Sequence, residues 1–248
     1  MIEVIGNMNK LLNIALFLSL SVLADNEIYV DQSGNSANID LEQLGSSNLI
    51  GGTSAVSGTM TALDLDGVSM TLDINQIGSS NVFRSDAIDG DNFTGFFEFT
   101  GDSNVFDILM DSTGLIDSDY VNLNINVTGS SNTFDLAIAE DDDASYLDLD
   151  WIITGGSNEF DFDIDYANAI NYVDVNGSSN TLNFSGSGYA GNTSSDSGYF
   201  YLDLDGSSNT IDVTQSSTLA RDYLKIISNT SNSNICIKQD DSGGSTSC

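Results

Sequence analysis

The chain has 248 residues, and 37 Asp and Glu against 5 Lys and Arg give it a formal net charge of −32. This charge repels phosphate backbones and anionic membranes, so it excludes nucleic acids as partners and insertion of the mature chain into membranes. There is no histidine, and beyond residue 24 the only basic residues are Arg84, Arg221, Lys225 and Lys238. Enzymes that cleave acidic polysaccharides need basic groups next to the substrate carboxylate, and this chain has few. The remaining catalytic alternative is a glycosidase that uses two carboxylates. We expect no enzymatic activity.

Residues 1–24 have the parts of a secretory signal peptide. Met8, the predicted translation start, is followed by Lys10, by an apolar run over 11–23 and by the small residue Ala24. The run of about 13 residues is too short to span a bilayer. We therefore expect cleavage after Ala24 and an exported protein, located outside the cell or at the cell surface.

A Gly-x-x-Asn motif, most often Gly-Ser-Ser-Asn, recurs along the rest of the chain between stretches of alternating apolar and polar residues. Its members are Gly45 and Asn48, Gly78 and Asn81, Gly101 and Asn104, Gly129 and Asn132, Gly155 and Asn158, Gly177 and Asn180, and Gly206 and Asn209, and Gly34 opens the series in a degenerate copy. Alternation with period two predicts half-buried strands on both sides of each turn. A spaced internal repeat is typical of solenoids, so the repeating unit is predicted to be strand, turn, strand.

Two architectures share this alternation. In a meander of hairpins, the strands on either side of one turn pair with each other, whereas in a solenoid each strand pairs with its counterpart one coil away. Tight hairpin turns prefer Asn-Gly or Asp-Gly because of their positive φ angles, and Ser-Ser supplies neither. Stacked asparagines can also form a hydrogen-bonded ladder. The solenoid is therefore favoured: an all-β domain over residues 25–235, with roughly eight or nine coils.

Between the apolar positions lie aspartates on the opposite face of the strands. Asp107, Asp135, Asp161 and Asp212 each lie three residues after a motif asparagine, so stacking would align them in a discontinuous column. Neighbouring carboxylates repel one another unless cations lie between them, and Ca²⁺ is the natural candidate because it takes several oxygen ligands. The alternative is a solvated acidic face that binds no metal. On the outward face, Tyr172 and Tyr201 could stack on sugars.

The C-terminal tail, residues 236–248, contains the only two cysteines, Cys236 and Cys248. An exported protein can form a disulfide between them, closing a small loop. Cys236 also lies two residues after Asn234 of a last degenerate copy, where other copies carry Phe or Ile. The alternative to a disulfide is thus a buried thiol in the core.

The first copies carry a longer pattern, with Gln32 before Gly34, Gln43 before Gly45 and Gln76 before Gly78. This Gln-x-Gly-x-x-Asn core, preceded by alternating aliphatic residues, resembles the curlin repeat of bacterial curli subunits. The resemblance covers 32–81, and later copies carry Phe99, Val127, Ile153, Val175 or Leu204 in place of the inward glutamine. It implies a bacterial exported subunit that polymerises into amyloid-like fibres with the help of secretion and assembly proteins.

These features lead to two functional hypotheses. The first is a structural subunit of an extracellular curli-like fibre, which self-assembles head to tail through the open strand edges of its ends and serves a biofilm matrix or surface adhesion. The second is a monomeric secreted adhesin that binds glycans or cations. In the first hypothesis the chain's main partner is another copy of itself.

Overall fold

The computed structural model describes residues 27–51, 63–110, 120–138, 146–166, 169–188, 199–217 and 223–239. The expected signal peptide, residues 1–24, lies outside these ranges. All elements in the described ranges are β-strands. No helix in this part of the chain is long and apolar enough to cross a membrane.

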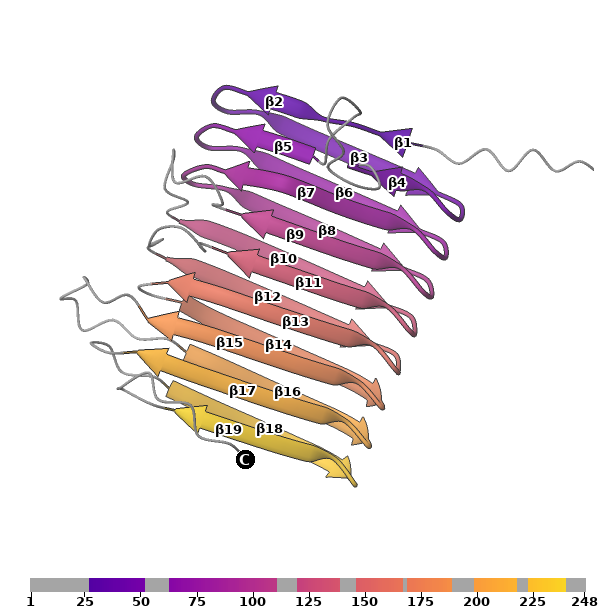
Figure 1. Ribbon diagram of the computed structural model, residues 1–248, viewed down its shortest axis with the longest axis vertical. Coiled ribbons are helices and arrows are strands. Elements are labelled where there is room, and N and C mark those ends of the chain that lie inside the picture. Colours follow the sequence, from indigo (N-terminus) through magenta and orange to yellow (C-terminus); the bar gives the residue numbers. More distant parts are fainter. Residues whose placement is uncertain are drawn as a thin grey trace, which may run out of the picture.

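The strands form two sheets that face each other, and within each sheet the strands stack along the long axis of the molecule (Figure 1). We call the eight-stranded sheet the A face; in order, it contains β3 (Asn38–Leu44), β6 (Thr71–Ile77), β8 (Thr94–Thr100), β10 (Val121–Thr128), β12 (Leu147–Thr154), β14 (Ala169–Ser178), β16 (Tyr199–Ser207) and β18 (Tyr223–Ser231).

The eleven-stranded sheet is called the B face. Its strands are β1 (Glu27–Ile28), β2 (Asp31–Ser33), β4 (Leu49–Ile50), β5 (Leu63–Asp66), β7 (Val82–Asp89), β9 (Val105–Met110), β11 (Thr133–Ile138), β13 (Glu159–Tyr166), β15 (Thr181–Gly188), β17 (Thr210–Ser217) and β19 (Asn234–Gln239). The first layer of this sheet consists of the short strands β1 and β2, which lie against β4 and β5.

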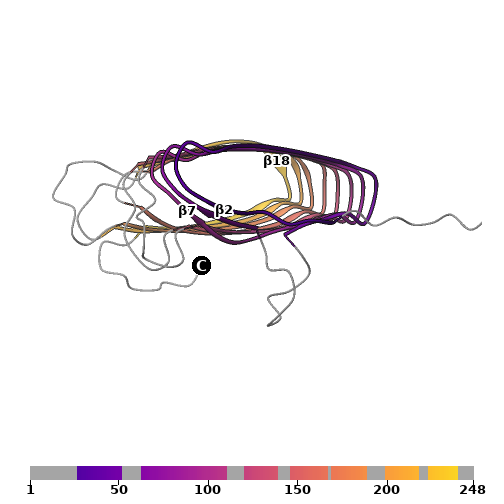
Figure 2. The same ribbon diagram turned by 90° about the horizontal axis from the view of Figure 1, so that it is seen from above.

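Strand pairing shows that the fold is a β-solenoid and not a meander of hairpins. Each strand pairs in parallel with its counterpart one coil away; β10, for example, pairs with β8 and β12, while β11, which follows it across the turn, lies in the other sheet. Parallel pairing over such distances requires the chain to travel around the coil between strands. Seen along the axis, the coil is a flattened loop with the two faces opposed (Figure 2).

The number of coils is slightly lower than the eight or nine expected. About six turns are complete, each with one strand on either face and a neighbouring coil on both sides, from β6 and β7 to β16 and β17. At one end, the coil that begins with β3 continues in two short strands, β4 and β5, and residues 52–62 between them lie outside the described ranges. At the other end, β19 extends the solenoid to Gln239, past the expected boundary at residue 235.

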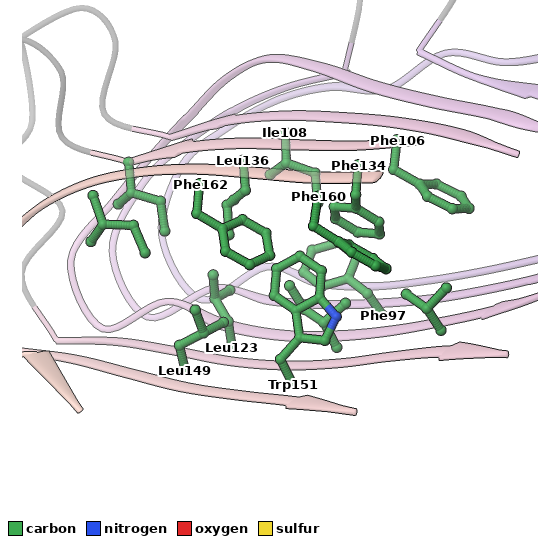
Figure 3. Packing of buried hydrophobic residues seen from close by; sticks show 14 of the residues in the cluster. Phe97, Phe106, Ile108, Leu123, Phe134, Leu136, Leu149, Trp151, Phe160 and Phe162 are labelled. Atoms are coloured by element: carbon green, nitrogen blue, oxygen red, sulfur yellow. The ribbon is translucent and has the colours of Figure 1, made fainter. Parts of the chain in front are cut away.

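The core lies between the two faces and is built by the alternation that the sequence predicts. In β10 the inward residues Val121, Leu123, Ile125 and Val127 are buried, while the residues between them are partly or fully exposed. Register places like residues in columns, so Phe106, Phe134 and Phe160 follow one another on the B face. Trp151 reaches across from the A face and meets Phe134 at 4.6 Å between ring centroids (Figure 3).

Two interpretations of single residues are wrong, and register is the reason in both cases. Gly34 does not belong to the column of Gly45. It begins a second column, at the other corner, in which Gly67 packs against the carbonyl of Gly34 and Gly90 against the carbonyl of Gly67. Cys236 is not in a core position, because it is the register partner of Asp212 in the outward acidic row. The last coil is offset by one residue: Ser233 occupies the place of the motif asparagine.

Candidate functional site

The motif asparagines form a continuous ladder at the turns. The backbone N–H of each of Asn48, Asn81, Asn104, Asn132, Asn158 and Asn180 donates to Oδ1 of the asparagine in the next coil, at 2.8–3.0 Å. Asn209 continues the series by donating to Ser233 Oγ at 3.1 Å. These side chains are at most 2 % exposed, so each rung satisfies a buried backbone group that would otherwise lack a partner.

The motif glycines are required by close stacking. A Cβ on Gly78, Gly101, Gly129, Gly155, Gly177 or Gly206 would collide with the carbonyl oxygen of the preceding glycine in the column. Most of these glycines also have φ angles between +132 and +143°, which other residues rarely adopt. Gly45 has the same backbone, but a Cβ there would meet only Asn48 Nδ2 at 3.4 Å. The corner of the first coil is thus open on its outer side.

The serine just before each motif asparagine has a left-handed backbone, which was not foreseen from the sequence. Ser47, Ser80, Ser103, Ser131, Ser157, Ser179 and Ser208 all have φ between 58 and 62°. The sequence argument against hairpins assumed that Ser-Ser would not adopt a positive φ. It led to the correct fold, but the assumption was incomplete, because serine has a positive φ at this position. Its N–H donates to the next coil, as from Ser103 to the carbonyl of Ser130 at 3.0 Å, and this bond offsets the strain.

The four candidate calcium ligands lie in one outward row of the B face. Asp107, Asp135 and Asp161 are successive register partners, and Asn183 separates them from Asp212. The chain's own cations lie at both ends of the row: Arg84 is 3.5 Å from Asp107, and Lys238 is 3.7 Å from Asp212. Among the described residues, no group of three or more acidic, cysteine or histidine side chains is close enough to hold a metal ion. Calcium binding stays a prediction.

The outer side of the A face carries an aromatic ladder over its last coils. Tyr199 and Tyr223 are register partners with ring centroids 4.8 Å apart and planes 4° from parallel, and Tyr201 lies beside Tyr199 at 6.2 Å. Parallel rings this close partly overlap face to face, so Tyr199 and Tyr223 each cover part of the other's ring. Tyr172 and Tyr223 are still 43 % and 42 % exposed. The sequence indicated Tyr172 and Tyr201; outward parity in β16 and β18 could also have identified Tyr199 and Tyr223.

One carboxyl group on this face is electrostatically perturbed. Partial burial raises the pKa of Asp174, and the nearby carboxylates of Asp203, Asp205 and Asp150 raise it further. Asp174 and Asp203 are direct register partners on β14 and β16. Unlike the row on the B face, this cluster was not singled out from the sequence.

Among the described residues, the A face has three open hollows. The largest, about 300 Å³, lies beside the stacked pair Tyr120 and Tyr146, whose rings are 4.9 Å apart. A second of about 280 Å³ lies at Phe96 and Glu98, and a third of about 80 Å³ lies between Tyr201 and Lys225.

Within the described residues, both ends of the stack have unpaired strand edges, and the first and last segments carry opposite charges. No strand among the described residues pairs with the outer edge of β3 or of β18. The first described segment, 27–51, contains Glu27, Asp31, Asp40 and Glu42 and no basic residue, whereas the last, 223–239, contains Lys225 and Lys238 and no acidic residue. Both ends also leave core positions incompletely covered, including Ile39 and Leu41 at the first and Leu224 and Ile226 at the last.

Cys236 is 9 % exposed and disulfide-bonded. Cys248, the partner expected from the sequence, lies outside the described residues. Cys236 lies within β19.

Comparison with known proteins adds no relative. The chain matches no protein-family model, no curated protein and no solved structure. The likeness to curlin repeats therefore depends on the residues of the first copies. There, Gln76 Nε2 donates to Gln43 Oε1 at 2.8 Å, so the inward glutamines also stack.

Proposed function

We propose that the chain is a structural subunit of an extracellular, amyloid-like fibre that assembles head to tail. The observation that carries this proposal is the pair of open strand edges, on β3 and β18, at ends of opposite charge. An unpaired parallel edge is a template for another strand, and natural sheets normally block such edges with proline, bulges or covering segments. The chain has no proline.

Charge selects the polarity of assembly. An acidic first coil attracts the basic last coil of another copy, while pairing two first coils would place like charges together. Away from the ends, the large negative charge of the chain keeps the sides of neighbouring fibres apart. The assembly would thus grow along the solenoid axis and resist lateral clumping.

The fibre would serve a bacterial biofilm matrix or surface adhesion, as the likeness of the first copies to curlin repeats suggests. Secretion and assembly proteins would be its accessory partners. The alternative, a monomeric adhesin for glycans or cations, has weaker support. Tyr199 and Tyr223 cover part of one another's ring faces, which leaves less flat surface for sugars at this pair.

The test is electron microscopy and fibre diffraction of the purified mature chain over a range of concentrations. We expect fibres that form above a critical concentration and are seeded by preformed fragments. Their diffraction should show a meridional reflection near 4.8 Å. Protein that stays monomeric at every concentration and ionic strength would overturn the proposal and favour the adhesin.

A further inference from the structure

The two faces of the solenoid differ by one layer. The A face has eight layers, from β3 to β18, whereas the B face has nine, because β1 and β2 form a layer on β4 and β5 before the chain reaches β3. The described chain thus begins and ends on the B face (Figure 1). As a result, the described strands of two rigid copies cannot close both faces at a junction.

Two junctions are geometrically possible. If β19 of one copy stacks on β1 and β2 of the next, the B face is continuous, but one strand position stays empty on the A face between β18 and β3. If β18 instead pairs directly with β3, the A face is continuous. In that case β19 must lie on β4 and β5, in the place that β1 and β2 occupy.

Pairing strongly favours the second junction. Strands β1 and β2 are joined to their neighbours by only two and three residue pairs. Strand β3 pairs with β6 over seven residues and offers the same seven on its outer edge, and β18, with nine residues, is long enough to match them. Stacking on β1 and β2 gains at most five pairs and leaves the edges of β3 and β18 unpaired in the junction.

Side chains also match in the second junction. Outward residues form one unbroken row across the A face, from Asp40 through Asp73, Phe96, Asn124, Asp150, Tyr172 and Tyr201 to Lys225. Continuing this register places Lys225 directly against Asp40 of the next copy, with Glu42 on the same strand nearby. The inward neighbours Leu224 and Ile226 meet Ile39 and Leu41, so the half-buried residues of both ends would cover one another.

We infer that residues 27–33, which contain β1 and β2, are a displaceable plug; this inference rests on the proposed fibre function. During growth, β18 of one copy pairs with β3 of the next, and β19 takes the place of β1 and β2 on β4 and β5. The free monomer is thereby protected at its first end by a weak layer, which slows spontaneous nucleation. A growing fibre exchanges that layer for the longer strands of another copy.

Subunit rise along the fibre distinguishes the two junctions. At about 4.8 Å per layer, displacement gives eight layers and a rise of about 38 Å, whereas stacking on the plug gives nine layers and about 43 Å. Helical reconstruction of fibres by cryo-electron microscopy measures this value directly. A rise near 43 Å would overturn the plug and leave the fibre proposal intact; absence of any fibre would overturn both.

A disulfide lock tests displacement by another route. Glu27 and Leu49 are Cα partners, so Glu27→Cys with Leu49→Cys fixes β1 on β4. The matched control is Thr133→Cys with Glu159→Cys, which joins β11 to β13 in the middle of the same face. We expect the oxidised lock to slow seeded elongation at least tenfold, while the control grows at the wild-type rate. Equal growth of both oxidised variants would overturn the inference.

Charge exchange tests the register. Lys225→Asp and Asp40→Lys should each slow seeded elongation, and the double variant should restore it. Asp40→Lys alone is the decisive single change, because it lowers the net negative charge and would speed any non-specific association. Faster growth of this variant, or no rescue in the double variant, would contradict the pairing of Lys225 with Asp40.

Discussion

The backbone N–H of Asn104 donates to Oδ1 of Asn132, 2.8 Å away and one coil further along the stack. This one bond joins residues 28 positions apart, and its repetition turns a local motif into an axial ladder. The turn therefore holds successive coils together as well as reversing the chain. Substitutions in the turn can separate the contribution of the ladder to stability from that of the sheets.

Replacing Asn132 by alanine should destabilise the monomer by about 1–3 kcal/mol, because it leaves the buried N–H of Asn104 without an acceptor. The exposed Asn122→Ala is the control, since it removes the same side chain from β10 without touching the ladder. Urea unfolding followed by circular dichroism measures both. Similar midpoints for the two variants would contradict a structural role for the ladder.

Gly129→Ala and Gly45→Ala separate two effects that coincide in the turn. Both glycines have a positive φ, +143° and +121°, but only at Gly129 would a Cβ collide with the carbonyl of the preceding coil. We expect a cost of roughly 1–2 kcal/mol for Gly45→Ala from backbone conformation alone. Gly129→Ala should cost clearly more and disturb the neighbouring coils. Thermal unfolding of the two variants side by side gives the comparison.

Trp151, the only tryptophan, is fully buried, and its Nε1 has no hydrogen-bond partner. Trp151→Ala should cost about 3–5 kcal/mol because it opens a cavity beside Phe134 and Phe162. Trp151→Phe should cost much less, because it keeps most of the volume and removes the unpaired N–H. Differential scanning calorimetry measures both, and equal losses in the two variants would contradict the role assigned to the packed volume of the ring.

Asp174→Asn should stabilise the protein at neutral pH by roughly 0.5 kcal/mol, the size of a cross-strand repulsion between exposed charges. Burial and the carboxylates of Asp203, Asp205 and Asp150 raise the pKa of Asp174 above its usual 3.8, so folding favours the protonated form. That stability is fully present below the unfolded pKa and is lost as pH rises through the folded pKa. The advantage of the variant should therefore vanish in acid.

Melting temperatures of both proteins from pH 3 to pH 7 provide this measurement. Asp148→Asn, at an exposed position of β12, is the control for the loss of one negative charge. An advantage of Asp174→Asn that persists unchanged below pH 3.5 would contradict the assigned cause.

Several features of the fold could be predicted from the sequence because they repeat. The period of two identifies inward residues such as Leu123 and Ile125, which are buried. Fixed spacing from the motif asparagine also aligns Asp107, Asp135 and Asp161 in one row. In both cases the information is local, since it depends only on distance from the nearest turn.

Other features could not be predicted, because they depend on which residue lies on which in the next coil. The offset at Ser233 moves Cys236 from an apparent core position into the row of Asp212. Gly34 carries the same local pattern as Gly45 but lies at the opposite corner, half a coil away. Ser131 adopts a left-handed backbone that its residue type does not indicate; the stack supplies the compensating bond.

By itself, the sequence determined that the chain forms half-buried strands joined by repeated turns and that the strands' outward face is acidic, because alternation and spacing are properties of consecutive residues. Only the tertiary structure decided the register between coils, the overlap of tyrosine rings and the extra layer formed by β1 and β2. These depend on where the stack begins and ends. Insertions of unequal length separate the turns, so residue number alone does not give position along the axis.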